Sequence, residues 1–153
     1  MIRRAVTLLI LVGLVVWRIG PLVNGEAITV PVEPVDPRDL FRGDYVILSY
    51  AFSRASALDG AFSPAEGQTV YAVLTRDGNH WRAAYFTYQK PTEGVFLRGT
   101  VLSGNRVEYG IESYFVQEGT GRKYEDAVRD RKLYAELRVG RDGTAALHAL
   151  KIE

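Results

Sequence analysis

The sequence contains no cysteine, a single methionine and only two histidines among its 153 residues. Without cysteine, the chain forms no disulfide and no thiolate metal site, which excludes the small cystine-stapled scaffolds. His80 and His148 lie in different predicted hairpins with no third ligand in view, so both are expected on the surface and a zinc site is not expected. No glycine-rich phosphate loop precedes a helix, so nucleotide binding has no support. We therefore expect no cofactor.

A strong charge bias is also absent. Apolar residues make up 47% of the chain and charged residues 24%, a composition typical of a globular protein. Residues 26–153 carry sixteen basic and eighteen acidic side chains, because Arg3, Arg4 and Arg18 all lie before them. The resulting net charge of −2 in this part of the chain gives no basic surface to favour nucleic acid.

The N-terminal segment combines a basic head with an uncharged apolar run. Arg3 and Arg4 precede the thirteen uncharged residues of Ala5–Trp17. A cleaved signal peptide fits this pattern, as does an uncleaved membrane anchor. A buried core helix fits less well, because a terminal basic head followed by unbroken aliphatic residues is a poor design for a soluble protein.

Length favours the anchor. A membrane-crossing helix needs about twenty apolar residues, and residues 5–23 nearly reach this length if Arg18 extends toward the far headgroups. Trp17 then lies at the membrane interface, where tryptophan is common. We expect residues 1–25 to form an inner-membrane anchor with a cytoplasmic N-terminus, and residues 26–153 to form one exported, periplasmic domain.

The exported domain is predicted to be mainly β. Short alternating runs are separated by turn residues, including Asp77-Gly78 and Asp142-Gly143, which favour tight hairpins. The predicted strands cover 44–51, 68–75, 81–88, 95–102, 106–116, 133–139 and 144–152, after an edge or lead-in strand at 27–30. We expect an antiparallel sandwich or partly open barrel of about seven strands with one short surface helix within 122–130, preceded by an N-terminal transmembrane helix.

The run from Arg42 to Tyr50 is predicted to be the central strand. Strand alternation places Val46, Leu48 and Tyr50 on one face and Tyr45, Ile47 and Ser49 on the other. Because both faces are largely apolar, we expect this strand to be covered on both sides. The preceding segment, 36–41, is predicted to form one helical turn capped by Asp36.

The same run carries a family signature. Five residues match the pattern G-D-Y-x-x-L-x-Y without departure, namely Gly43, Asp44, Tyr45, Leu48 and Tyr50. The chain resembles the GDYXXLXY family of bacterial membrane-anchored proteins, and the resemblance extends to the N-terminal segment and to Tyr114–Gly121. It implies an inner-membrane anchor, an exported β domain and a polytopic membrane protein as partner. The family has no established catalytic residues, so the resemblance implies none here.

One carboxylate cluster is a candidate for chemistry. Asp36, Asp39 and Asp44 lie close together before and at the start of the central strand. They could hold a cation or act as an acid–base pair. The simpler interpretation, which we favour, is that Asp36 caps a turn and Asp44 accepts backbone N–H bonds beside Gly43.

Aromatic residues give a second candidate site. Seven of them could line a groove for a ligand or peptide, although core packing explains most aromatics in β domains: Tyr45, Tyr50, Trp81, Tyr85, Tyr88, Tyr109 and Tyr114. The candidate functional surface is Asp36, Asp39, Asp44, Tyr50, Trp81 and Tyr85. We expect a binding or accessory module for an envelope membrane protein; the alternative is an exported enzyme centred on Asp44 and neighbouring tyrosines.

Overall fold

The computed structural model describes residues 6, 9–10, 13–14, 25–34, 41–42, 45–55, 62–117 and 120–153, with only the backbone described for 41, 42 and 45. Residues 6, 9–10 and 13–14 are helical. Within these described residues, no helix is both long and apolar enough to cross a membrane.

The first sheet joins the start of the domain to its end. It contains β1 (Glu26–Pro31), β9 (Leu133–Val139) and β10 (Ala145–Ile152), all antiparallel, in the order β1-β9-β10. The ladder between β1 and β9 runs from Glu26 opposite Val139 to Pro31 opposite Tyr134. The predicted edge strand is therefore confirmed, and Pro31 ends it at the position where a missing N–H is tolerated.

The second sheet is built around the predicted Asp77-Gly78 hairpin. It contains β4 (Thr69–Asp77), β5 (His80–Thr87), β6 (Phe96–Val101) and β7 (Val107–Glu108), in the order β5-β4-β6-β7. Gly78 has φ +62°, the left-handed conformation that a tight primed turn requires. The inward-facing residues of β4 are Val70, Ala72 and Leu74, which alternate with half-buried ones.

The third sheet contains the predicted central strand. Strand β3 (Tyr45–Ile47) lies between β2 (Phe41–Arg42) and β8 (Ser113–Phe115). The strand is shorter than predicted, because the chain turns into the 3-10 helix η1 (Ala51–Ser53) directly after Tyr50. Val46, Leu48 and Tyr50 of one predicted face are buried, whereas Ile47 and Ser49 of the other are only half-buried, so covering on both sides was a wrong expectation.

A single predicted strand over 106–116 is also wrong. The chain leaves β7 at Glu108, turns at Gly110 and enters β8 at Ser113, in a different sheet. Gly110 has φ +81°, and the Glu112 carboxylate accepts hydrogen bonds from the N–H groups of Tyr109 and Gly110. The kink interrupts the alternation, so Ile111 stays buried while Phe115 is 60% exposed.

Two further helical segments each connect one strand to the next. The 3-10 helix η3 (Ser103–Asn105) joins β6 to β7, and α2 (Gly121–Arg129) joins β8 to β9. The short charged helix is thus confirmed. It buries Ala127 and Val128 and packs Tyr124 partly against the core, which is the face that the sequence predicts.

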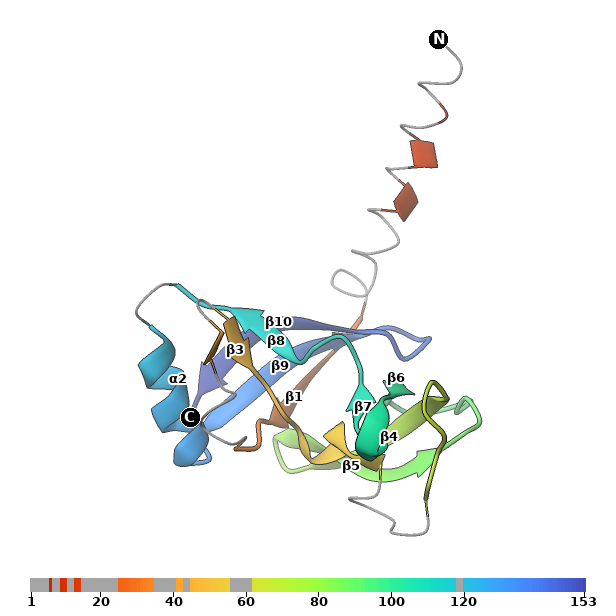
Figure 1. The fold of residues 1–153 in the computed structure, drawn as a ribbon, viewed down its shortest axis with the longest axis horizontal. Coiled ribbons are helices and arrows are strands. Elements are labelled where there is room, and N and C mark those ends of the chain that lie inside the picture. The colour runs from red at the N-terminus through yellow and green to blue at the C-terminus, as the bar shows by residue number, and fades with distance from the viewer. Residues whose placement is uncertain are drawn as a thin grey trace.

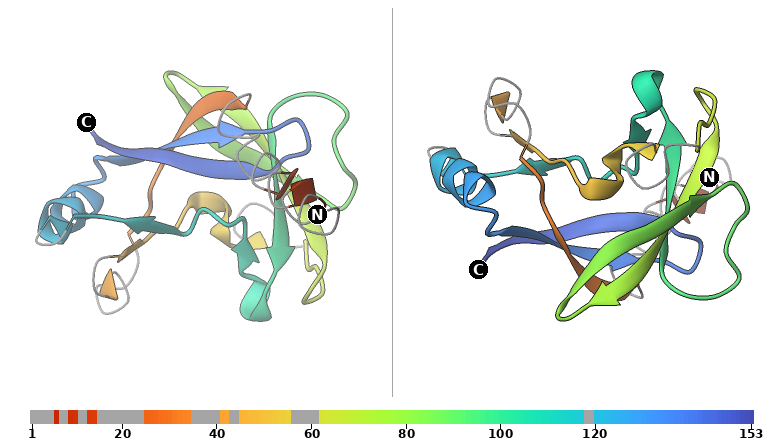
Figure 2. Two further views of the ribbon diagram at one scale, coloured as in Figure 1. Left: turned by 90° about the horizontal axis from the view of Figure 1, so that it is seen from above. Right: turned by 90° about the horizontal axis from the view of Figure 1, so that it is seen from below.

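The sheets lie in crossing layers. The β9–β10 hairpin runs beside β1, and α2 lies at the end of this hairpin that carries the C-terminus (Figure 1). Figure 2 shows the β4–β5 hairpin crossing the β9–β10 hairpin, while β3 and β8 lie in a separate layer. The mainly β prediction is confirmed, with the strands distributed over three small antiparallel sheets. Among the described residues, the largest fully buried side chains come from the first two sheets and from the connections near β3 and β8: Tyr50, Phe52, Leu97, Ile111, Leu133 and Leu137.

The turn between β9 and β10 is fastened to β6. Gly143 donates its N–H to Gly140 and accepts the N–H of Arg98 at 2.8 Å. The Arg98 guanidinium also reaches Asp142 at 3.7 Å and donates to the Thr144 hydroxyl at 3.3 Å. Burial opposes ionisation of Asp142, but hydrogen bonds from Thr144 and the charge of Arg98 outweigh it and lower its pKa. The turn therefore has a fixed position against the second sheet.

Candidate functional site

The last residue of the family motif is built into the core. Tyr50 is 1% exposed, and its hydroxyl donates to the carbonyl of Ile111 at 2.9 Å. Its N–H donates to the Ser53 hydroxyl at 2.9 Å, while the Ser53 N–H returns to the Tyr50 carbonyl at 2.8 Å. Leu48 is also buried. The sequence placed Tyr50 on a candidate surface; the structure instead uses it to join the motif to the kink at Ile111.

Two further aromatic rings complete this cluster. The Tyr50 ring stacks on Phe52 with centroids 5.0 Å apart, and Phe52 meets the edge of Tyr109 at 5.3 Å. The Tyr109 hydroxyl donates to the Phe52 carbonyl at 2.9 Å. Each buried phenol therefore has a backbone acceptor, which removes the cost of burying its polar end.

Glu112 brings a negative charge close to both phenols. Its carboxylate accepts the Gly110 N–H at 2.8 Å, and its backbone carbonyl accepts the Leu48 N–H at 2.7 Å. Burial, and then the Glu112 charge, raise the pKa of Tyr50 and of Tyr109 far above the usual tyrosine value. Both phenols thus remain neutral donors, which suits a structural role better than proton abstraction.

The other motif residues contribute less to the described site. Gly43 and Asp44 lie outside the described residues, as do Asp36 and Asp39 of the carboxylate cluster. Tyr45 is described by its backbone, which pairs with Arg42 and Phe115. The alternative roles of the carboxylate cluster therefore stay predictions.

Trp81 and Tyr85 lie on opposite faces of β5. A regular strand would place both on one face, but a β-bulge intervenes, since Val73 pairs with Tyr85 and the next residue, Leu74, pairs with Ala83. Trp81 packs partly against the core, whereas Tyr85 is 53% exposed. Because Tyr50 is buried, the structure does not bring these three residues together into one groove.

Three aromatic side chains stack at the C-terminal end of β5. Phe62 stacks between the buried Phe86, at 5.6 Å, and Tyr88, at 4.4 Å. Tyr88 is 46% exposed. Tyr88 belongs to the aromatic set that the sequence offered, but Phe62 does not, because it lies in a loop with no strand pattern around it.

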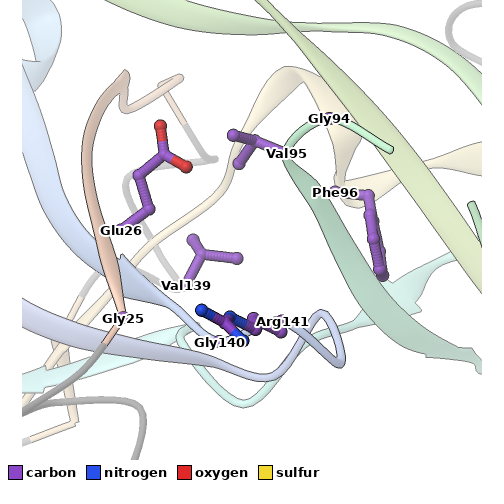
Figure 3. A pocket seen from close by; sticks show the side chains of 8 residues that line it. All are labelled: Gly25, Glu26, Gly94, Val95, Phe96, Val139, Gly140 and Arg141. Carbon is purple, nitrogen blue, oxygen red and sulfur yellow. The ribbon is translucent and has the colours of Figure 1, made fainter. Parts of the chain in front are cut away.

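A pocket of about 270 Å³ lies between the start of β1, the segment before β6 and the β9–β10 turn. Its lining is Gly25, Glu26, Gly94, Val95, Phe96, Val139, Gly140 and Arg141. In Figure 3, Glu26 extends from the β1 side and Arg141 from the turn, with Val139 between them in this view. Sequence reasoning missed this site, because it depends on the β1–β9 register; the only local signal was the Arg141–Gly143 turn.

The histidines occupy different environments. His80 is hydrogen-bonded to Glu153 at 3.1 Å and stacks on the Tyr134 ring at 4.2 Å, whereas His148 is exposed on β10. In the part of the chain that the structure describes, no three His, Asp or Glu side chains come together in a way that could hold a metal ion.

Comparison with known proteins agrees with the motif. The family model for GDYXXLXY proteins matches residues 7–150, which is nearly the whole chain. No curated protein and no solved structure matches it. The match spans the motif, the kink with Glu112, α2 and the final hairpin. The chain belongs to the GDYXXLXY protein family.

Proposed function

We propose that the protein is a single-pass inner-membrane protein whose periplasmic β domain serves as a binding or accessory module for an envelope membrane protein. One observation carries the anchoring part. The helical residues Val6, Leu9, Ile10 and Leu14 expose between 49% and 71% of their surface. Large aliphatic side chains are costly to leave in water, and a lipid bilayer would cover them.

The use of the family motif supports binding over catalysis. Leu48 and Tyr50 are buried in the core. The raised pKa of Tyr50 keeps its phenol protonated at neutral pH, so the phenol is a poor base. In contrast, Tyr85 on β5 and Tyr88 directly after this strand are 53% and 46% exposed. Exposed aromatic side chains are typical anchors of protein interfaces. We propose that the three sheets form a partly open barrel that presents Tyr85 and Tyr88 to the partner.

Anchoring and topology are tested on the full-length protein. We expect it to stay with the membrane through alkaline extraction, at the intact mass of the uncleaved chain. A C-terminal alkaline phosphatase fusion should be active, because that reporter folds only after export. Release by alkali, or the mass of a shortened chain, would contradict the anchor and favour the signal peptide.

The partner is tested by purification from membranes in a mild detergent, followed by mass spectrometry. We expect a stoichiometric membrane protein with the parent chain and its loss from the Tyr85→Ser/Tyr88→Ser variant. Ile152→Ser is the matched control, because Ile152 on β10 has the same 46% exposure as Tyr88. A parent chain that purifies alone would overturn the accessory role, whereas equal loss from Ile152→Ser would contradict the β5 contact.

A further inference from the structure

Two side chains of opposite charge line the pocket beside β1. Glu26 and Arg141 both line it, and both are exposed. Among the described residues, neither side chain takes part in an ion pair. The neighbouring Asp142 does not serve Arg141, because it is bound to Thr144 and Arg98. A guanidinium and a carboxylate are thus both available to a ligand.

The pocket is held open by backbone structure. Glu26 pairs with Val139 in the β1–β9 ladder, which fixes the carboxylate side. Arg141, which carries the guanidinium, directly follows Gly140 in the β9–β10 turn. The Gly140 N–H donates to the Thr144 carbonyl at 2.8 Å. Gly143 packs against the Phe96 ring so closely that an added Cβ would lie 2.8 Å from it. Because these contacts fix the backbone around the pocket before a ligand binds, less conformational entropy is lost on binding.

We propose that this pocket binds a phosphoethanolamine group, with the phosphate on Arg141 and the ammonium on Glu26. A guanidinium offers a planar fork of donors that matches a phosphate, and an ammonium group offers three donors to a carboxylate. Val95 and Val139 supply apolar surface for the two carbons between them. The volume of about 270 Å³ suits a small group rather than a larger ligand.

The pocket's place in the chain indicates a lipid as the source of this group. Gly25 ends the N-terminal segment and Glu26 begins the domain, so the pocket lies where the domain leaves the membrane if the proposed anchor is correct. This step rests on the proposed function. The recognition chemistry does not, since a free phosphoethanolamine ester presents the same two charges.

The headgroup is tested first without a bilayer. Full-length protein in a maltoside detergent is titrated calorimetrically with glycerophosphoethanolamine and, separately, with glycerol 3-phosphate. We expect Arg141→Gln to weaken both by about tenfold, the usual effect of losing one charged hydrogen bond. Glu26→Gln should weaken only glycerophosphoethanolamine, because glycerol 3-phosphate has no ammonium group.

Matched controls are available on α2. Arg122→Gln and Glu125→Gln remove the same charges from a helix that does not line the pocket, and we expect parent affinity from both. All four variants should keep the parent melting temperature, because the replaced side chains are exposed or half-buried and form no ion pair with another described residue. No binding by the parent chain, equal weakening by the controls, or tighter binding of glycine than of glycerophosphoethanolamine would overturn the proposal.

A second arm identifies the source. The protein is placed in bilayers of phosphatidylcholine with or without phosphatidylethanolamine, and soluble glycerophosphoethanolamine is then titrated. Phosphatidylethanolamine should block the titration if the lipid headgroup occupies the pocket, whereas unchanged binding would assign the pocket to a soluble ester. An anchored protein that fails the detergent titration overturns the pocket alone, and a protein that binds in detergent but leaves membranes in alkali overturns the anchor alone.

Discussion

The rings of Tyr50 and Tyr109 both pack against Phe52 in the core. Their hydroxyl groups donate to backbone carbonyls on different segments. Tyr50 reaches Ile111 at the kink, and Tyr109 reaches Phe52 in η1. The two bonds therefore hold together the motif strand and the kink, which are far apart in sequence. The last tyrosine of G-D-Y-x-x-L-x-Y is explained by this bond without any reaction at the site.

Removing the Tyr50 hydroxyl should destabilise the domain while the ring stack persists. Tyr50→Phe keeps the contact with Phe52 but leaves the Ile111 carbonyl without its phenol donor. We expect a loss of about 1–3 kcal/mol in the free energy of unfolding, measured by urea denaturation. Tyr85→Phe is the control and should change it by less than about 0.5 kcal/mol, because Tyr85 is exposed. Equal effects would contradict a special role for Tyr50.

The same phenols should limit stability at alkaline pH. Burial, with the Glu112 charge adding to it, raises the pKa of Tyr50 and Tyr109 in the folded state above the value of about 10 in the unfolded chain. The two phenols therefore make their full contribution to the free energy of unfolding below a pH of about 10. This contribution is lost as the pH rises further. We expect the free energy of unfolding to fall by up to about 1.4 kcal/mol per pH unit for each phenol.

The control for this pH dependence is the Tyr50→Phe/Tyr109→Phe variant. It retains every other titrating group, so urea denaturation should give a visibly shallower decline for it above pH 10, approximately. Parallel curves for the parent and the variant would show that other groups cause the alkaline loss.

At the scale of elements, the sequence predicts hairpins well and changes of sheet poorly. The turns at Gly78 and Gly143 were recognised because Asp-Gly is a local signal. The break at Gly110 was missed because it depends on the Glu112 carboxylate and on a third sheet that receives β8. The bulge that turns Tyr85 outward depends on β4, and local alternation cannot reveal it.

The two hairpin glycines should respond differently to alanine. Both have positive φ, +62° at Gly78 and +83° at Gly143, so both replacements cost about 1–2 kcal/mol of backbone strain. Only at Gly143 would the added Cβ also meet Phe96, at 2.8 Å, and this clash adds about 1–3 kcal/mol. Urea denaturation of Gly78→Ala and Gly143→Ala checks the order. A larger loss at Gly78 would contradict the fixed packing of the β9–β10 turn.

At the scale of the molecule, contacts between distant segments define the two ends of the domain. Glu26 and Arg141 line one pocket because of the β1–β9 register, and His80 contacts Glu153, which directly follows β10. The sequence predicted the strands that carry or adjoin these residues. It did not predict which of them come together, because strand order and register are set by the whole core. The mainly β class was therefore accessible from sequence, and the pocket was not.

The contact of His80 with Glu153 should couple the second sheet to the chain terminus weakly. We expect a double-mutant cycle of His80→Phe and Glu153→Gln to give about 0.2–1 kcal/mol, the usual range for partly exposed pairs. Phenylalanine preserves the ring that stacks on Tyr134. Urea denaturation of the four proteins measures the coupling, and a value of zero would show that the stack alone holds this end.

The ladder between β1 and β9 has a mechanical consequence. β1 begins directly after Gly25, so it is the first strand that bears a force applied at the start of the domain. Its pairing with β9 extends over all six residues of β1. Pulled along its length, this ladder is loaded in shear, so its hydrogen bonds share the force and do not open one after another. The domain should therefore resist unfolding when it is pulled through Glu26 along β1.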